Sequence, residues 1–245
     1  MSDTFQTAVL TGASRGFGRA IAAALVAGGT RVVGIARDER ELRAVRDELG
    51  EGFVPIAADA TDEALAHEVI RDHRPGLLVL NAGATPHMAP LHEQTWETFS
   101  RTWHVDTRHA FVWTRAALRE PLAPGGVVLA MSSGAALNGS PLSGGYATAK
   151  SGVRAISGYA ADEARRAGLG LRFVALLPGL TPTGVGAVGV AGYAAREGVD
   201  RDTFVAGLQP VLTPELVAKA VMEVAGDPDS AAEYRIGADG PSPIG

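Results

Sequence analysis

Short apolar runs alternate along the chain with longer segments in which apolar residues recur every three or four positions. The short runs predict strands, and the longer segments predict helices. Strands that are apolar on both faces and joined by helices are typical of a parallel sheet covered on both sides. The expected strands are residues 7–10, 31–36, 53–57, 77–80, 127–131 and 171–177, and the expected helices are residues 16–27, 39–49, 62–73, 95–119 and 147–167.

This alternation predicts one doubly wound α/β domain over residues 1–245, with a mostly parallel sheet of about seven strands flanked by helices. Right-handed crossovers place every strand-to-helix loop at one edge of the sheet, where ligands of such folds bind. Residues 184–212 are rich in Gly, Ala and Val and break the regular pattern. We interpret this segment as a mobile cap over the site.

The amino-acid composition excludes several classes of binding partner and of chemistry. A formal charge of −5 favours neither nucleic acid nor an anionic membrane. The chain has no cysteine, which excludes disulfides, thiolate nucleophiles and cysteine-based zinc sites. Residues 1–6 are short and polar, and the longest apolar stretch, residues 20–29, is far below a membrane span, so we expect a cytoplasmic protein. No metal is expected either, because helical metal-ligand spacing is missing from His87, His92, His104 and His109.

The first strand-to-helix turn is rich in glycine. It reads Thr-Gly-Ala-Ser-Arg-Gly-Phe-Gly over residues 11–18. Gly12, Gly16 and Gly18 allow a tight turn, close approach of a pyrophosphate and tight packing of a helix whose N-terminus favours negative charge. Such a turn alone is weak evidence in a chain with 31 glycines, but its place in the first strand–helix unit favours a Rossmann-type dinucleotide site.

The end of the second strand indicates which dinucleotide is bound. A carboxylate there usually holds the ribose 2′-hydroxyl of NAD, whereas the 2′-phosphate of NADP needs cations. The strand ends Ala36-Arg37 with no acid before Arg37, and Arg15 of the glycine turn can reach the same place. Two guanidinium groups suit a phosphate, so we predict NADP(H). The alternative is that both arginines are merely solvated.

Further motifs follow the later strands in order, and together they resemble the short-chain dehydrogenase/reductase family over nearly the whole chain. The resemblance implies a single Rossmann-type domain in which Asp59 contacts the adenine and Asn81 steadies the sheet edge. Taken singly, some of these residues have structural explanations, such as capping of the next helix by Asp59 or Thr61. The motifs are the turn at 11–18, Asp59, Asn81-Ala82-Gly83, Ser133, Tyr146-Ala-Thr-Ala-Lys150, and Pro178-Gly179 with Thr183.

The resemblance also implies a full set of cofactor contacts, with Thr181 and Thr183 at the nicotinamide end and Lys150 on the nicotinamide ribose. The implied cofactor-binding residues are Gly12, Ser14, Arg15, Gly16, Phe17, Gly18, Arg37, Asp59, Ala60, Asn81, Ala82, Gly83, Tyr146, Lys150, Pro178, Gly179, Thr181 and Thr183.

Tyr146 and Lys150 are four residues apart, so on a helix they share one face. Lys150 is one of only two lysines among 22 basic residues. A free tyrosine has a pKa of ~10, and a neighbouring ammonium group favours its phenolate. Tyr146 can then take a proton from an alcohol or return one to a carbonyl. By resemblance, Ser133 hydrogen-bonds the substrate oxygen, while its neighbour Ser132 is better suited to backbone bonding.

Asp106 departs from the family pattern, which commonly has an asparagine in the fourth helix that holds a water of the proton relay. A lone carboxylate on an apolar face is costly unless it is paired, so we expect a partner. Its charge could keep Lys150 protonated, the relay could be impaired, or the helix could turn Asp106 out to solvent. The apolar stripe comprises Trp96, Phe99, Trp103, Asp106, Ala110, Trp113 and Ala117.

The expected function is hydride transfer between NADP(H) and a ketone or secondary alcohol, as in a carbonyl reductase or alcohol dehydrogenase, with Tyr146 as acid/base. One alternative is a non-catalytic or weakly active NADP(H)-binding regulatory protein with an altered relay at Asp106, and another is a non-redox or isomerising enzyme. Apolar residues of the cap suit an apolar substrate, and an acyl-carrier substrate stays open. The resemblance implies a homodimer or homotetramer packed through the long fourth and fifth helices.

Overall fold

The computed structural model describes residues 5–245, which form one α/β domain around an eight-stranded sheet in the order β3-β2-β1-β4-β5-β6-β7-β8. The first seven strands are parallel and β8 is antiparallel to β7, which confirms the mostly parallel sheet. The strands are β1 (Thr7–Thr11), β2 (Arg31–Ala36), β3 (Phe53–Ala57), β4 (Leu77–Leu80), β5 (Val127–Met131), β6 (Arg172–Pro178), β7 (Glu233–Gly237) and β8 (Gly240–Pro243).

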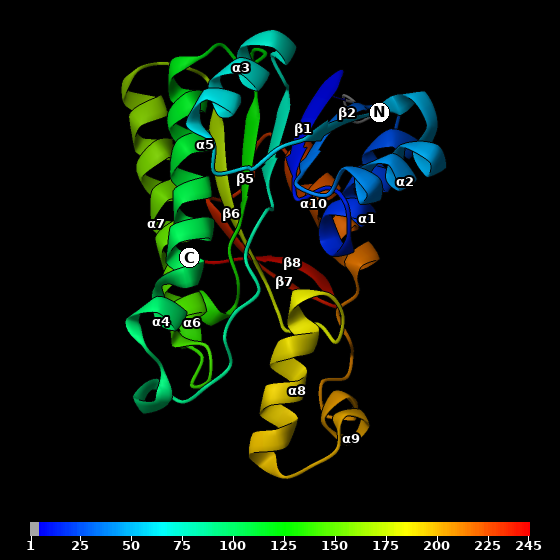
Figure 1. Cartoon of the computed structure of the whole chain (residues 1–245). Helices are drawn as coiled ribbons and strands as arrows, with labels where there is room; N and C mark the ends of the chain where they lie inside the picture. The colour runs from blue at the N-terminus through cyan, green and yellow to red at the C-terminus, as the bar shows by residue number, and fades with distance from the viewer. Residues whose placement is uncertain (1–4) are drawn as a thin grey trace.

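Helices cover both faces of this sheet (Figure 1). One apolar core lies between the sheet and α1, α2 and α10, and a second lies between the sheet and α3, α5 and α7. Trp113 of α5 and Phe53 of β3 are the largest fully buried side chains of the two cores. These helices are α1 (Gly16–Ala27), α2 (Glu39–Leu49), α3 (Glu63–His73), α5 (Arg108–Arg119), α7 (Gly144–Arg166) and α10 (Pro214–Gly226).

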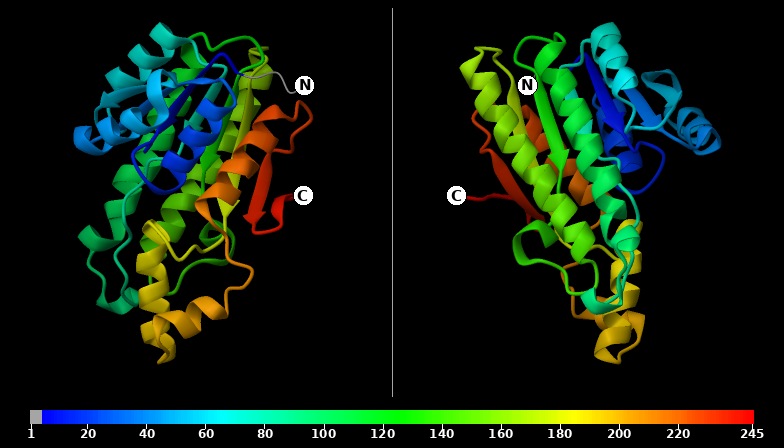
Figure 2. Two further views of the ribbon diagram at one scale, coloured as in Figure 1. Left: turned by 90° about the vertical axis from the view of Figure 1, so that its right-hand side faces the viewer. Right: turned by 60° about the vertical axis from the view of Figure 1, so that its left-hand side comes forward.

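Two helices lie beyond the carboxyl ends of the strands, at one end of the molecule in every view (Figures 1 and 2). They are α8 (Val185–Glu197) and α9 (Arg201–Ala206), so the expectation of an irregular segment at 184–212 is wrong. Glycine lowers helix propensity, but packing requires it here. A Cβ at position 186 would lie 2.1 Å from the carbonyl oxygen of Thr181, and one at position 192 would lie 2.9 Å from the Met88 side chain.

The predicted helix 95–119 is interrupted. It consists of α4 (Trp96–Thr102), a π-helical turn at Trp103–Thr107, and α5. The wider π turn changes which side chains share a face, so the predicted buried stripe is wrong at two positions: Trp96 is 75% exposed and Trp103 is 47% exposed. Asp106, in contrast, is turned fully inward.

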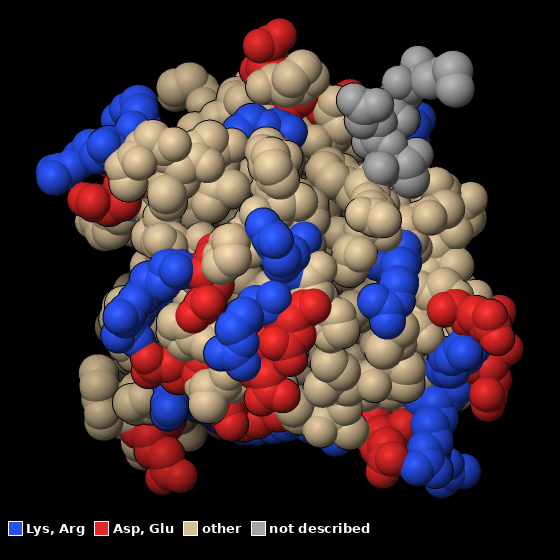
Figure 3. Space-filling view, turned by 90° about the horizontal axis from the view of Figure 1, so that it is seen from above, with Lys and Arg blue, Asp and Glu red and all other residues tan. Residues whose placement is uncertain are grey.

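The surface carries both signs of charge. On the face seen in Figure 3, basic and acidic side chains are interspersed. In residues 5–245, none of the helices has the length and hydropathy needed to cross a bilayer. Most of the N-terminal segment on which the expectation of a cytoplasmic protein partly rested lies outside the described residues.

Candidate functional site

The glycine turn after β1 is tied to the end of β4 by Thr11. The Thr11 hydroxyl oxygen accepts hydrogen bonds from the backbone N–H groups of Asn81 (3.0 Å) and Ala82 (3.1 Å). The Asn81 side-chain amide donates in return to the carbonyl oxygens of Thr11 and Gly12, both at 3.1 Å. These hydrogen bonds hold the two strand ends together at one edge of the sheet.

The glycines of this turn are needed for two different reasons. A Cβ at Gly18 would lie 2.0 Å from the carbonyl oxygen of Gly12, so α1 could not pack this closely on the turn with any other residue there. Gly16 has a φ of +54° and faces open space. Arg15 provides no side-chain cap to α1, so the N–H groups of its first turn are open to an anion. Phe17 packs on the core below.

His109 of α5 is a site residue that sequence reasoning missed. Its Nε2 lies 2.9 Å from the Thr11 hydroxyl oxygen, which accepts two N–H groups and also lies 3.3 Å from the carbonyl oxygen of Val79. Burial, with a further contribution from the Lys150 charge, lowers the pKa of His109 to about 3, so the ring is neutral at pH 7. The sequence contained one indication that His109 belongs to the site, since it follows Asp106 by three residues on a predicted helix.

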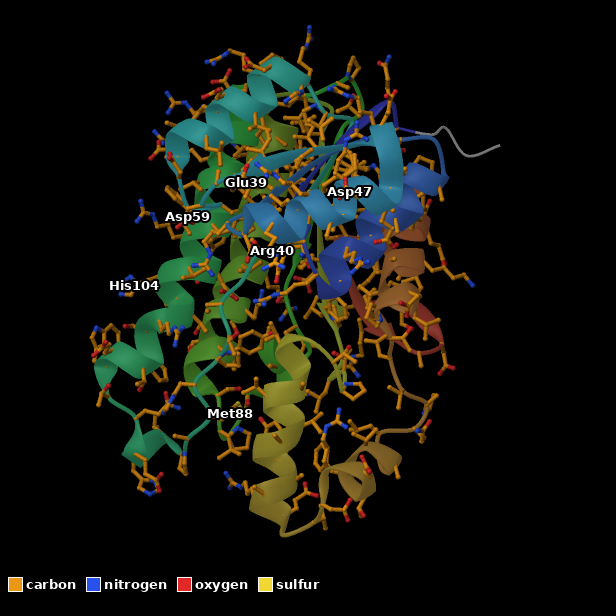
Figure 4. The ribbon with its side chains drawn as sticks, turned by 45° about the vertical axis from the view of Figure 1, so that its right-hand side comes forward. Glu39, Arg40, Asp47, Asp59, Met88 and His104 are labelled. Atoms are coloured by element: carbon orange, nitrogen blue, oxygen red, sulfur yellow. The ribbon has the colours of Figure 1, made fainter. Side chains whose placement is uncertain are left out.

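The predicted 2′-phosphate end of the site contains two polar groups beyond the turn, Arg37 and Glu41. Arg15 and Arg37 are exposed, and Ser14 donates a hydrogen bond to the Glu41 carboxylate at 2.7 Å. This contact between the glycine turn and α2 was not predicted, because Glu41 reads as one of many charged residues on a surface helix. Figure 4 shows the neighbouring Glu39 and Arg40 in the first turn of α2.

Asp59 and Ala60 follow β3. One Asp59 oxygen accepts the Thr61 N–H at 2.8 Å, and this bond, together with the hydroxyl of Thr61 and the charges of Arg37 and Arg108, lowers the pKa of Asp59 despite partial burial. Asp62, rather than Asp59 or Thr61, caps α3. The buried indole N–H of Trp113 donates to the Ala60 carbonyl at 2.7 Å and so fixes this loop.

α7 begins at Gly144, three residues before the predicted start, so Tyr146 belongs to its first turn. A Cβ at Gly145 would lie 2.0 Å from the carbonyl oxygen of Phe99, and glycine therefore permits close packing of α7 on α4. Tyr146 is half-buried, and the Lys150 ammonium lies 5.7 Å from the centre of its ring. The predicted pair thus shares one face.

The Lys150 ammonium is buried and held from two sides. It donates to the carbonyl oxygen of Met131 at the end of β5 (2.9 Å) and lies 3.1 Å from Oδ2 of Asp106. Burial alone would lower the pKa of Lys150, but the Asp106 carboxylate and Tyr146 outweigh it, and the pKa is raised. The lysine is therefore cationic at neutral pH.

Asp106 has the partner that its position required. Its side chain is 1% exposed, which rules out the interpretation that the helix turns it to solvent. Its second oxygen accepts the backbone N–H of Ala84 at 2.7 Å, so the carboxylate joins Lys150 to the loop after β4. A Cβ at Gly83 would lie 3.0 Å from Oδ2, which explains glycine at that position.

Ser132 and Ser133 have different surroundings. The buried Ser132 hydroxyl donates to the Lys150 carbonyl oxygen at 2.8 Å and so pins α7 to β5. The half-buried Ser133 hydroxyl oxygen accepts the Ala135 N–H at 3.2 Å, which leaves its proton available for another acceptor.

The segment after β6 leads into α8. Gly179 donates its N–H to the Ile236 carbonyl oxygen at 3.0 Å, next to Pro178 at the strand end. The buried Thr181 hydroxyl donates to the Thr183 carbonyl oxygen at 3.2 Å. Thr183 itself is exposed.

α8 also contacts the two loops on the far side of the site. The Tyr193 hydroxyl hydrogen-bonds Ser140, which in turn lies 2.6 Å from the Ser143 hydroxyl. Met88, from the loop after β4, lies beside this helix (Figure 4). Among residues 5–245, no three His, Asp or Glu side chains converge in a way that could hold a metal ion.

Comparisons with known proteins agree with this geometry. A family model described as short chain dehydrogenase matches residues 6–190. The chain is 33% identical to the cis-4-hydroxycyclohexanecarboxylate dehydrogenase of Sinomonas cyclohexanicum over 245 residues, covering 95% of this chain and 93% of the relative.

Solved structures give the same result. A 3-ketoacyl-(acyl-carrier-protein) reductase from Brucella melitensis complexed with NADH aligns with a TM-score of 0.77 and 25% identity over 90% of both chains. NAD+-bound xylitol dehydrogenase has the same fold, with a TM-score of 0.80 and 22% identity over 91% of this chain and 92% of the other. This chain is therefore an oxidoreductase of the short-chain dehydrogenase/reductase family.

Proposed function

We propose that the chain is an NADP(H)-dependent carbonyl reductase or alcohol dehydrogenase that acts on a ketone or secondary alcohol, with Tyr146 as acid/base. The observation that carries the proposal is the buried Lys150 cation, fixed between Met131 and Asp106 on the same helix face as Tyr146. A relative of this chain bears the name of a dehydrogenase of a hydroxylated ring, and a structural neighbour that of a ketone reductase.

The residues around the glycine turn fit a dinucleotide. The uncapped first turn of α1 and the open space at Gly16 suit a pyrophosphate, with Gly12 and Gly18 allowing the close approach of backbone that such a ligand needs. Arg15 and Arg37 would hold a 2′-phosphate, which is the basis for proposing NADP(H). The bound nicotinamide supplies or accepts a hydride.

The chain's own residues would move the proton. Tyr146 donates it to the carbonyl oxygen in reduction and accepts it from the alcohol in oxidation. Lys150 stabilises the phenolate of Tyr146 electrostatically, because a cation at this distance in a desolvated site is weakly screened. Ser133 donates its free hydroxyl proton to the substrate oxygen, where negative charge develops.

Asp106 would keep Lys150 cationic and in place, so we favour the interpretation in which the relay is retained. The carboxylate opposes the cost of burying the ammonium and anchors it to the Ala84 N–H. In this role Asp106 is a positioning residue for Lys150.

We further propose that residues 184–212 form the substrate cap. The Tyr193–Ser140 hydrogen bond and the contact of Met88 with α8 would hold the cap beside the site that contains Ser133. Opening of the cap would break these contacts and admit a small-molecule substrate.

A homodimer or homotetramer is part of the proposal. Exposed aromatic side chains lie on the outer face of α5, α7 and the π turn: Trp103 is 47% exposed, Phe111 is 52% exposed and Tyr159 is 70% exposed. A second copy of the chain would cover this face.

The replacement Tyr146→Phe tests the proposed chemistry. It removes the phenolic hydroxyl and keeps the ring, so we expect turnover to fall at least 1,000-fold, on the order of what loss of a general acid and its proton path costs, while NADPH binding is unchanged. NADPH oxidation is followed with a panel of ketones, and NADPH binding by fluorescence titration. Retained turnover in this variant would remove the mechanism. Tight NADPH binding by the native chain without turnover of any substrate would instead favour the regulatory alternative.

A further inference from the structure

Glu41 lies unexpectedly close to the glycine turn. Its Oε2 accepts the Ser14 hydroxyl at 2.7 Å, and both side chains are half-buried. Ser14 stands between Gly12 and Gly16 in the turn, whereas Glu41 is on α2, whose first residue is two positions after Arg37. The contact therefore joins the two segments between which the 2′ position of the adenosine ribose would lie.

The other acids of this helix turn are engaged elsewhere. Asp38 accepts the Glu41 backbone N–H at 3.0 Å and so caps α2. Glu39 pairs with Arg43 at 2.6 Å. Within residues 5–245, none of the ion pairs includes Glu41. Its negative charge is therefore not neutralised by an arginine, although Arg15 and Arg37 lie on the flanking segments.

We propose that Glu41 is a specificity-determining residue that limits the preference for NADP(H) and allows NAD(H) to bind. The inference rests on the proposed cofactor site. Glu41 and a 2′-phosphate compete for Ser14, whose hydroxyl has one proton to donate. A 2′-phosphate also carries close to two negative charges and is repelled by the carboxylate. A 2′-hydroxyl, in contrast, can donate a hydrogen bond to Glu41, as it does to the carboxylate that ends the second strand in NAD-binding folds.

The replacement Glu41→Gln tests this role. The amide has the same shape and can still accept the Ser14 hydroxyl, but it has no charge. We expect NADPH to bind about tenfold more tightly and NADH binding to stay within twofold or weaken. Dissociation constants for both dinucleotides are measured by isothermal titration calorimetry, and melting temperatures show that the variant is folded.

Two further variants locate the effect. Glu39→Gln removes the same charge two residues earlier, from a carboxylate already paired with Arg43, and should leave the ratio of the two dissociation constants within twofold. Arg37→Asp should shift the ratio toward NADH. A ratio unchanged by Glu41→Gln, or changed equally by Glu39→Gln, overturns the role of Glu41. If the native chain binds neither dinucleotide, the proposed cofactor site itself fails, and if Arg37→Asp leaves the ratio unchanged, the assignment of NADP(H) fails.

Discussion

At the scale of single residues, the centre of the site is a charge pair that water does not reach. Lys150 is 7% exposed and Asp106 is 1% exposed, so neither charge could persist there alone. Such a pair adds little net stability, because desolvation offsets most of the attraction between the charges. The pair instead has a positioning role, because it holds the Lys150 ammonium group beside Tyr146 and keeps it cationic.

Asp106→Asn should move the pH–rate profile of alcohol oxidation to higher pH by about one unit. The carboxylate raises the pKa of the buried Lys150, so its removal weakens the positive charge beside Tyr146. The profile is measured with saturating cofactor, and NADPH affinity is measured in parallel to show that the site is intact.

Asp47→Asn is the matched control for this change, because it removes an exposed carboxylate on α2 (Figure 4). Its profile should coincide with that of the native enzyme. Coincident profiles for Asp106→Asn and the native enzyme would place the carboxylate outside the proton relay.

His109 should make the protein sensitive to acid. Its folded-state pKa of about 3 lies below the ordinary value of 6.5, so the unfolded chain takes up a proton first as the pH falls. The stabilisation from the neutral ring is complete above pH 6.5 and is lost toward pH 3, at ~1.4 kcal/mol for each pH unit. His109→Asn should therefore flatten the pH dependence of the free energy of unfolding between pH 6.5 and 4.5 by about this slope, measured by urea denaturation. His87→Asn removes an exposed histidine and is the control; an equal effect of both changes would refute the assignment.

At the scale of elements, the local pattern of apolar and polar residues was enough to predict the bounds of strands and helices, except where tertiary packing overrode it. The six predicted strands and most helix ends were placed to within a residue or so, because buried strands read as continuous apolar runs. The sequence pattern failed where glycine has a packing role: α7 starts at Gly144, and α8 contains Gly186, Gly189 and Gly192. It also failed at the π turn, which shifts the helix face at Trp103.

The same contrast holds for the candidate site. The glycine turn and the Tyr146–Lys150 pair are encoded by short spacings, so they could be read from the sequence. The contacts of Thr11 with His109 and of Ser14 with Glu41 join segments that are 98 and 27 residues apart. No local pattern carries such contacts, because they depend on how strands and helices are arranged in space.

Gly145→Ala should destabilise the protein by ~2–4 kcal/mol, because the new methyl group would meet the backbone of Phe99 and force α4 and α7 apart. Gly158→Ala, on the same helix with open space around it, should instead stabilise it by ~0.5–1 kcal/mol. Both values come from urea denaturation. Equal effects of the two changes would show that close packing at Gly145 is unimportant.

At the scale of the whole molecule, the exposed aromatic face predicts self-association. Phe111→Glu places a charge at the centre of this face and should convert the oligomer to a monomer at micromolar concentration, as measured by sedimentation velocity. Leu169→Glu adds the same charge beyond the far end of α7 and should leave the oligomer intact. A monomeric native protein would refute the proposed assembly.

The place of β1 inside the sheet affects the order in which parts of the protein fold during translation. β1 lies between β2 and β4, and Thr11 at its end is hydrogen-bonded to His109 of α5. At ~5–20 residues per second, a nascent chain therefore waits on the order of 5–20 s between making the glycine turn and making the residue that secures it. The glycine turn is thus translated before the strand β4 and the helix α5 that hold it, and we expect no dinucleotide to be captured before these elements are in place.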